Sequence, residues 1–258
     1  MNSKILSSSV KGEGPALIIL HGLFGSSDNL SRVATELEKN YRVYRIDLRN
    51  HGASFHDNEM SYAAMVNDLK SCMDALDIDK AHIIGHSMGG KVAMGFSLQY
   101  PNKVQKLIVA DIAPVTYPPH HTQILKALKS MPLAQINSRK MADEHLAQFI
   151  DEQGVRQFLL KSLELNKTEP ARWKFNLSAI LENYDEILSG IESPKPFLGK
   201  TLFIAGGSSD YIKPEYKQKT IELFPKTQLK IIPDASHWLH AEKPKIFIGI
   251  CQRFLDEK

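Results

Sequence analysis

A serine between two glycines is the feature of this sequence with the clearest chemical potential. Residues 85–89 read GHSMG, a G-x-S-x-G pentapeptide centred on Ser87. An apolar run at 81–84 precedes it and a helical pattern follows it, which is the strand–turn–helix context that exposes a nucleophilic hydroxyl. Glycine two residues before and two residues after the serine lets the strand and the helix approach each other closely at so sharp a turn. We therefore predict Ser87 as the nucleophile of a hydrolase, with the Met88 amide as one oxyanion donor.

A second oxyanion donor is expected from the loop after the first apolar run. Residues 21–25 read HGLFG. Gly22 lets the backbone approach the serine closely, and a loop at this place commonly completes an oxyanion hole. We choose the Leu23 amide, with the Phe24 amide as the alternative, and expect the Phe24 side chain to line the substrate site. His21 is expected to be buried and to hydrogen-bond this loop.

The nucleophile needs a base whose pKa lies near neutrality, and histidine is the usual choice. His237 lies in PDASHW at 233–238, directly after the last apolar run, so the chain returns it to the edge of the sheet where the serine lies. It also follows Ser87 in the chain, the order used by serine hydrolases built on a parallel sheet. We predict His237 as the base, with His240 as its nearest rival. Three further histidines fit exposed or structural roles better: His51, His120 and His121.

The acid that orients this histidine has two candidates, and both lie between Ser87 and His237 in the chain. Asp210 ends GSSD at 207–210 after an apolar run, which is the commoner location for such an acid. Asp111 ends the apolar run KLIVAD and is the alternative. Chain order cannot separate them, so both stay open, with a slight preference for Asp210.

Short apolar runs that alternate with amphipathic segments would position these residues. The pattern predicts an α/β fold with a mostly parallel, doubly wound sheet, and residues 4–10 as an antiparallel edge strand. The apolar runs are typical of buried parallel strands and lie at 16–21, 41–48, 81–86, 106–111, 201–205 and 229–233. Helices are predicted at 28–39, with Asp28 at its start, and at 61–76, 87–100, 214–224 and 244–255.

One region interrupts this alternation. Residues 114–196 contain no strand-like run and are bounded by proline-rich stretches, so we predict a helical cap there, inserted into a core formed by 1–113 and 197–258. Helical patterns lie at 123–129, 138–151, 155–165 and 175–188. A cap would determine the shape of the substrate site. The aromatic residues that we expect to line that site, besides Phe24, are Phe158, Trp173, Tyr184 and Trp238.

Composition narrows the function classes. The 258 residues are 43% hydrophobic and 24% charged, and a net charge of +3 is too small an excess to indicate a nucleic-acid partner. No apolar run is long enough for a signal peptide or a membrane span, so we expect a cytoplasmic protein without membrane insertion, as a monomer or a small homo-oligomer. Cys72 and Cys251 are expected to be buried, reduced thiols. Without metal-ligand spacing, or a strand followed by G-x-G-x-x-G, we expect no metal and no cofactor.

Taken together, these stretches resemble the α/β-hydrolase superfamily and, within it, the small bacterial YbfF-type esterases. The pentapeptide and the HG loop are shared across the superfamily, whereas RNHG, DIAPV and HAEKP are more particular. The matching stretches extend over nearly the whole chain: HGLFGSSDNL at 21–30, DLRNHGAS at 47–54, GHSMGGKVAM at 85–94, ADIAPV at 110–115, FLLKS at 158–162, WKFN at 173–176 and HWLHAEKP at 237–244.

The resemblance implies carboxylester hydrolysis, with acyl-CoA thioesters as further substrates. It also favours Asp111, because the family keeps an aspartate there and often lacks one at the position of Asp210. We therefore predict a serine carboxylesterase that hydrolyses short-to-medium acyl esters of small molecules through an acyl-enzyme on Ser87. Two alternatives stay open: carbon–carbon bond hydrolysis or perhydrolysis on the same fold, and a non-catalytic ligand-binding module. Dehalogenases and epoxide hydrolases are disfavoured, because they use aspartate at the elbow, the sharp turn that carries Ser87 in this sequence.

Overall fold

The sheet at the centre of the fold has seven strands in the order β1-β3-β2-β4-β5-β8-β9. The computed structural model describes residues 4–166 and 168–257. β1 runs antiparallel to β3, and every other pair in this sheet is parallel, as predicted. The strands are β1 (Ser8–Lys11), β2 (Ala16–Leu20), β3 (Arg42–Ile46), β4 (Ala81–His86), β5 (Val104–Ala110), β8 (Lys200–Gly206) and β9 (Thr227–Ile232).

The middle strands are continuously apolar because helices cover both faces of the sheet. Every residue of β4 is buried. In β2, Ile18 and Leu20 pack in one hydrophobic cluster, whereas Leu17 and Ile19 pack in the other. Successive side chains of a strand point to opposite faces, so a strand buried on both faces needs apolar residues at every position. This is why unbroken apolar runs located these strands in the sequence.

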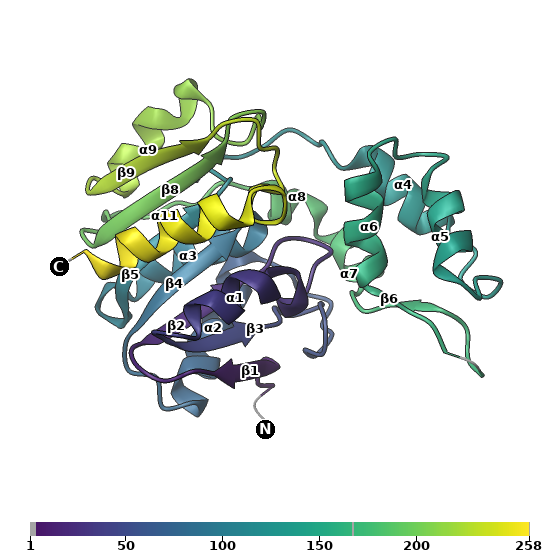
Figure 1. Ribbon diagram of the computed structural model, residues 1–258, viewed down its shortest axis with the longest axis horizontal. Coiled ribbons are helices and arrows are strands. Elements are labelled where there is room, and N and C mark those ends of the chain that lie inside the picture. The colour runs from purple at the N-terminus through teal and green to yellow at the C-terminus, as the bar shows by residue number, and fades with distance from the viewer. Residues whose placement is uncertain (1–3, 167, 258) are drawn as a thin grey trace.

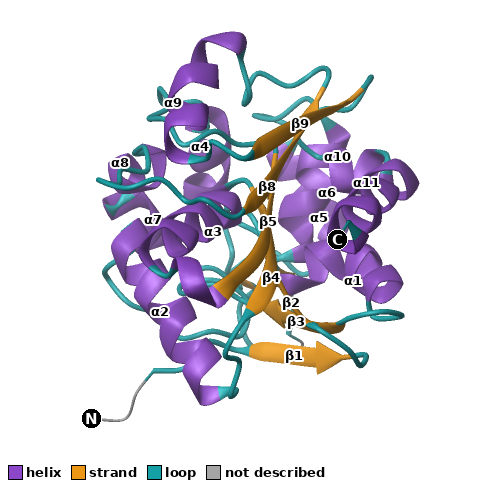
Figure 2. Ribbon diagram, turned by 90° about the vertical axis from the view of Figure 1, so that its left-hand side faces the viewer, coloured by secondary structure: helices purple, strands orange, loops and turns teal. Residues whose placement is uncertain are grey.

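Figure 2 shows the sheet edge-on between two layers of helices. One face is covered by α2 (Tyr62–Ala75), α3 (Met88–Gln99) and α9 (Lys217–Leu223), and the other by α1 (Ser31–Leu37) and α11 (Pro244–Asp256). This arrangement confirms the predicted doubly wound α/β fold. The short helix α10 (Leu239–Glu242) precedes α11, and short 3-10 helices lie at Ser27–Leu30, Pro101–Lys103 and Pro214–Tyr216.

Local signals explain where two of these helices begin. The Ser61 hydroxyl caps the first turn of α2, and Pro244 occupies the first position of α11, where its missing amide costs nothing. The first helix differs from its prediction. It begins at Ser31 instead of Asp28, because Ser27–Leu30 form a 3-10 turn ahead of it.

The segment between β5 and β8 forms a lobe beside the sheet, coloured teal to green in Figure 1. Its helices are α4 (Thr122–Ser130), α5 (Arg139–Leu146), α6 (Gln153–Lys161), α7 (Leu177–Glu182) and α8 (Tyr184–Leu188). The expectation that this segment lacks strands is wrong, since β6 (Leu163–Glu164) pairs antiparallel with β7 (Arg172–Trp173). Strands of two residues are too short to give a periodic pattern. The division into core and cap stays a prediction.

Two further expectations concern single features. Cys72 and Cys251 are both buried and unpaired, as predicted. Across residues 4–166 and 168–257, no helix has the length and apolar character needed to cross a membrane.

Candidate active site

The turn between β4 and α3 carries Ser87 in a conformation that few residues adopt. Its φ is 53° and its ψ is −122°, and its amide donates to the Ala110 carbonyl at 3.0 Å. A Cβ on Gly85 would lie 2.3 Å from the Gly89 carbonyl oxygen, and one on Gly89 would lie 2.5 Å from the carbonyl oxygen of His21. Only glycine fits at these two positions, so the pentapeptide pattern follows from packing at the elbow.

Three of the predicted residues are joined by hydrogen bonds. Ser87 Oγ lies 3.0 Å from His237 Nε2, and His237 Nδ1 lies 2.8 Å from Asp111 Oδ2. Asp111 is completely buried, whereas the His237 side chain retains 16% exposure. With Nδ1–H donating to the carboxylate, Nε2 is the ring nitrogen that can accept the serine proton.

The carboxylate of Asp111 is fixed at both oxygens. Asp111 itself has a φ of 52° directly after β5. Its Oδ1 accepts from the Gly206 amide at 2.8 Å, and its Oδ2 also accepts from the Ser209 hydroxyl. These bonds hold the carboxylate toward His237. Ser209 was missed in the sequence, since nothing in the spacing of GSSD shows which side chain turns inward.

The structure does not bring Asp210 to His237, which corrects the order of preference given above. The Asp210 side chain is 95% exposed, and its nearest charged neighbour is Lys213 at 3.8 Å. The turn after β8 directs Ser209 inward and therefore Asp210 outward. Asp111 occupies the place beside the imidazole.

The oxyanion loop leaves one amide unused near the serine. The Phe24 amide donates to His51 Nε2 at 3.1 Å, so it is not available to a substrate. Among the described residues, no acceptor takes the amides of Leu23 and Met88. A Cβ on Gly22 would lie 3.2 Å from the Ser87 Cβ, which shows how closely this loop packs against the elbow. The arrangement favours Leu23 over Phe24.

Two buried histidines hold this loop. His21 Nδ1 donates to the Gly22 carbonyl at 2.8 Å, while its Nε2 accepts from the Leu48 amide at 3.1 Å. His51 Nδ1 donates to a carbonyl at 3.0 Å, which leaves its Nε2 to accept from Phe24. Burial lowers the pKa of His51 to about 3 and lowers the pKa of His21 as well. Both rings are therefore neutral acceptors for backbone amides at neutral pH.

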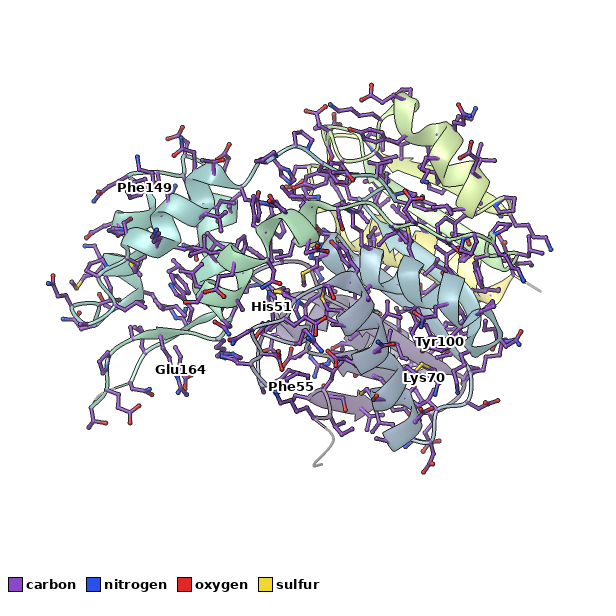
Figure 3. The ribbon with its side chains drawn as sticks, turned by 180° about the vertical axis from the view of Figure 1, so that it is seen from behind. His51, Phe55, Lys70, Tyr100, Phe149 and Glu164 are labelled. Atoms are coloured by element: carbon purple, nitrogen blue, oxygen red, sulfur yellow. The ribbon has the colours of Figure 1, made fainter. Side chains whose placement is uncertain are left out.

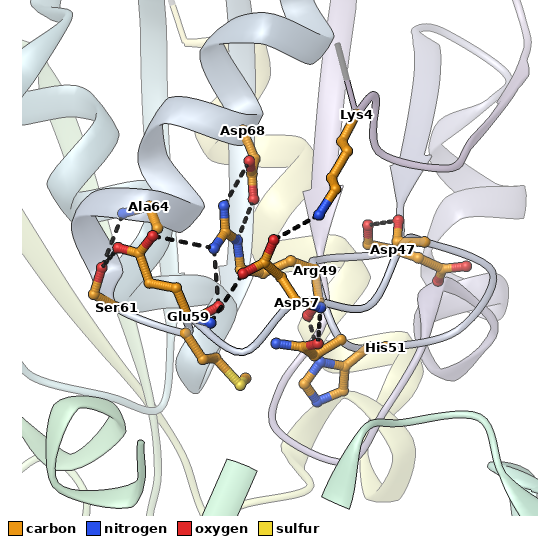
Figure 4. Close-up of polar contacts among 12 residues, drawn as sticks. Lys4, Asp47, Arg49, His51, Asp57, Glu59, Ser61, Ala64 and Asp68 are labelled. Atoms are coloured by element: carbon orange, nitrogen blue, oxygen red, sulfur yellow. Dashed lines mark hydrogen bonds and ion pairs between the residues drawn. The ribbon is translucent and has the colours of Figure 1, made fainter. Parts of the chain in front are cut away.

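The loop that carries His51 is itself anchored to α2. Figure 4 shows Arg49 paired with Asp68, and Arg49 Nη2 lies 2.9 Å from Asp68 Oδ1. The same guanidinium donates to the Glu59 carbonyl at 2.9 Å. Figure 3 shows His51 where the helical lobe meets the sheet, whereas Phe149 lies far out in the lobe. The RNHG segment thus positions His51 to hydrogen-bond the oxyanion loop.

A further histidine fixes the backbone of His237. His86 Nε2 donates to the His237 carbonyl at 2.9 Å. Burial keeps the pKa of His86 well below its usual value, so this ring is also neutral. The rival base His240 is buried behind His86, with ring centroids 4.4 Å apart, and does not contact Ser87.

An apolar cavity of about 270 Å³ opens beside Ser87 and His237. Of the predicted lining residues, Phe24, Phe158 and Trp238 line it. Trp173 and Tyr184 do not, which corrects those two expectations. Trp173 stacks on a neighbouring phenylalanine within the lobe, and the Tyr184 hydroxyl is bonded to His121. The lining residues that the sequence did not single out for this role include His120, His121, Ile124, Val155, Leu159 and Tyr211.

The chain matches known proteins over nearly its whole length. Residues 15–244 match the family described as the alpha/beta hydrolase fold. The chain is 37% identical to esterase YbfF of Escherichia coli (strain K12), covering 93% of each chain. It is also 37% identical to the sn-1-specific diacylglycerol lipase ABHD11 of Mus musculus, covering 93% of this chain and 81% of that one.

A solved structure described as a marine microorganism esterase superposes with a TM-score of 0.95 at 44% identity, covering 98% of this chain and all of that one. At this likeness the agreement includes the helical lobe as well as the sheet. The elbow, the HG loop and the parallel sheet are the parts common to the family. The chain belongs to the α/β-hydrolase fold family.

Proposed function

We propose that this protein is a serine carboxylesterase that hydrolyses short-to-medium acyl esters through an acyl-enzyme on Ser87. The observation that carries the proposal is the unbroken series of hydrogen bonds from the Asp111 carboxylate through the His237 imidazole to the Ser87 hydroxyl. A nucleophile that donates to a base, and a base that donates to a buried acid, is the arrangement that activates serine.

In the first half of the reaction, Ser87 Oγ attacks the ester carbonyl carbon while His237 Nε2 takes the hydroxyl proton. The carbonyl oxygen becomes an oxyanion, and the Leu23 and Met88 amides are the donors that stabilise it. When the tetrahedral intermediate collapses, its bond to the alcohol oxygen breaks, and His237 returns the proton to that oxygen. The alcohol leaves and an acyl-serine ester remains.

In the second half, water attacks the acyl-serine carbonyl while His237 Nε2 accepts a water proton. Collapse of the new tetrahedral intermediate breaks the bond to Ser87 Oγ, which regains its proton from the imidazole. The carboxylic acid leaves and the enzyme is restored. Asp111 accepts the hydrogen bond from His237 Nδ1 throughout and stabilises the transient imidazolium.

The cavity supports an acyl group of modest size. Its volume of about 270 Å³ lies just below the roughly 300–1,000 Å³ that is usual for drug-sized ligands. Apolar side chains dominate its walls, including Phe158 and Trp238. The names of the E. coli and mouse relatives support ester substrates. Acyl-CoA thioesters would react at the same serine and are a second substrate class to test.

We also propose that residues 114–196 act as a cap over a core formed by 1–113 and 197–258. The cavity walls support this division, because Ile124 and Phe158 come from the lobe, while Leu23 and Trp238 come from loops at the sheet. Substrate size would then depend on residues from both parts.

The decisive experiment compares two serines on the same stretch of chain. Ser87→Ala is expected to reduce hydrolysis of p-nitrophenyl butyrate to the background rate and to abolish labelling by a fluorophosphonate probe. Ser97→Ala is the matched control, because this buried hydroxyl donates to the Met94 carbonyl within α3. Undiminished activity in Ser87→Ala would overturn the proposal.

A substrate panel then defines the chemistry. We expect the highest kcat/KM on oxygen esters, with acyl-CoA thioesters measured alongside. Faster hydrolysis of a carbon–carbon bond, or faster formation of a peracid, would instead assign Ser87 to carbon–carbon bond hydrolysis or to perhydrolysis. A folded protein that no fluorophosphonate labels would instead indicate a binding module.

A further inference from the structure

Lys91 is a buried basic residue one helical turn beyond Ser87. Its amide donates to the Ser87 carbonyl at 3.1 Å, and its side chain is among the largest fully buried ones, with the residue 1% exposed. Within the described ranges, no carboxylate pairs with it. Burial lowers its pKa to about 7. A buried ammonium without an acid is costly, so its surroundings must supply other partners.

Those partners lie at the outgoing end of the helical lobe. Lys91 Nζ donates to the Leu188 carbonyl at 3.1 Å and also to the Ser189 carbonyl. Leu188 is the last residue of α8, where carbonyls have no partner within the helix. Lys91 therefore supplies hydrogen bonds to the backbone carbonyls of the turn through which the chain leaves the lobe and returns to the sheet.

Two tyrosine rings complete the surroundings of the ammonium. Lys91 Nζ lies 4.9 Å from the ring centroid of Tyr117 and 5.5 Å from that of Tyr62. The Tyr62 hydroxyl donates to the Ile187 carbonyl at 2.8 Å, and the Tyr117 amide donates to the Leu188 carbonyl at 3.0 Å. Because Tyr117 lies where the chain enters the lobe, Lys91 contacts both ends of segment 114–196.

The residues that Lys91 contacts extend to the proposed active site. A small cavity of about 20 Å³ is bounded by Ser87, Lys91, Tyr117 and Leu188, among others. The Tyr117 hydroxyl accepts from the Ala113 amide at 2.8 Å and donates to the Tyr211 carbonyl. One wall of the space beside Ser87 is thus built from residues in contact with the ammonium.

We propose that Lys91 is a positioning residue that fixes both ends of the helical lobe to the nucleophile helix and so determines the shape of the substrate site beside Ser87. The proposal rests on the proposed esterase function. It concerns substrate fit and leaves the chemistry to Ser87, His237 and Asp111. Removing the ammonium should weaken substrate binding more than it slows the chemical step.

The test replaces Lys91 with methionine, which has a similar length but no donor. In Lys91→Met we expect KM for p-nitrophenyl hexanoate to rise about tenfold while kcat changes less than about threefold, the effect of losing roughly one charge-assisted hydrogen bond. Hydrogen exchange of the amides in 184–191 should become faster in the folded protein, because the Ser189 carbonyl loses its bond to Lys91 and the Leu188 carbonyl is left with the Tyr117 amide.

Lys106 provides the matched control. It is also buried, and its Nζ donates to the carbonyls of Phe254 (2.9 Å) and Leu255 (2.7 Å) at the end of α11. It lies near the start of β5, at the opposite end of that strand from Asp111. Lys106→Met should lower thermal stability without changing KM or the exchange of 184–191.

The proposal is overturned if Lys91→Met lowers stability as Lys106→Met does but leaves KM and the exchange of 184–191 unchanged, or if kcat falls at constant KM. If Lys91→Met does not yield folded protein, the same measurements on Lys91→Gln, which replaces the ammonium with an uncharged amide on a shorter side chain, decide the question by the same criteria. The exchange measurement needs no substrate. It therefore tests the contact even if the esterase assignment fails, and that failure would appear separately as an inactive wild-type protein.

Discussion

The imidazole ring of His237 lies nearly parallel to the phenol ring of Tyr211, with ring centroids 3.9 Å apart and planes inclined by 20°. His237 is held at its two nitrogens by Asp111 and Ser87, and Tyr211 covers one of its faces. The Tyr211 hydroxyl is itself hydrogen-bonded to His120 Nε2 at 2.5 Å. The stack therefore restricts the imidazole to the plane in which both of its nitrogens have partners.

Replacing this ring should separate stacking from hydrogen bonding. We expect Tyr211→Ala to lower kcat for p-nitrophenyl butyrate about tenfold, because an imidazole free to rotate spends less time aligned with the serine. Tyr211→Phe keeps the stacked ring and loses only the hydroxyl, so kcat should stay within about twofold of wild type. Equal losses in the two variants would show that the hydroxyl, and not the stack, is what matters.

The two aspartates provide a direct comparison. Asp111→Asn keeps the shape of the side chain but cannot hold the imidazole in the required tautomer, so kcat should fall by about 10⁴. Asp210→Asn should leave kcat unchanged, because Asp210 is solvent-exposed and does not contact His237. Steady-state kinetics of both variants on one ester decide the assignment. A larger loss in Asp210→Asn would contradict it.

The sequence located Ser87 and His237 but left the acid open, and the physical reason is local. Asp111 and Asp210 both follow strands whose carboxyl ends lie near His237. Which carboxylate faces the imidazole depends on one turn after β8, where the Ser209 hydroxyl points to Asp111 and the next side chain points to solvent. Backbone torsions of such a turn are not encoded in residue type strongly enough to be predicted.

The strands could be predicted from the sequence, whereas the residues that line the cavity could be predicted only in part. Apolar runs such as 81–86 predicted the buried middle strands well, because burial on both faces constrains every position. The run 229–233 was predicted as buried too, but β9 lies at the edge of the sheet and most of its residues are exposed. Aromatic residues of the lobe were harder to place, since a side chain there can pack inside the lobe or face the cavity. Phe158 lines the cavity, whereas Trp173 packs inside the lobe and stacks on Phe175, with ring centroids 5.2 Å apart. Only the packing of the lobe distinguishes them.

Phe158 forms part of the wall of the cavity beside Ser87, where we propose that the acyl group binds. Its ring lies on α6 and contacts Trp238, with centroids 4.0 Å apart. Phe158→Ala removes this wall, so the preference in kcat/KM should shift toward longer acyl chains by about tenfold, comparing octanoate with butyrate. Trp173→Phe is the control, because Trp173 does not line the cavity. A profile that changes only in Trp173→Phe would contradict the assigned lining.

Acid should destabilise this fold at a higher pH than carboxylate protonation alone would. Several buried or half-buried histidines are neutral in the folded protein, because burial lowers their pKa: to about 3 for His51, His121 and His240, and to about 4 for His82. In the unfolded chain each has a pKa of about 6.5, so between that value and the lowered one the unfolded state binds more protons. The free energy of unfolding should therefore decrease as pH falls from 7 toward 5, before most carboxylates titrate.

His82 allows this prediction to be tested one proton at a time. Its Nδ1 is buried without a hydrogen-bond partner among the described residues, so His82→Leu should break no bond of that atom. Urea unfolding at pH 7.5, 6.0 and 5.0 should show a pH dependence of stability that is smaller in His82→Leu than in wild type. The difference approaches about 1.4 kcal/mol per pH unit once the unfolded histidine is fully protonated, because the variant lacks one titrating group. Identical slopes in the two proteins would mean that His82 is protonated in the folded state as readily as in the unfolded chain.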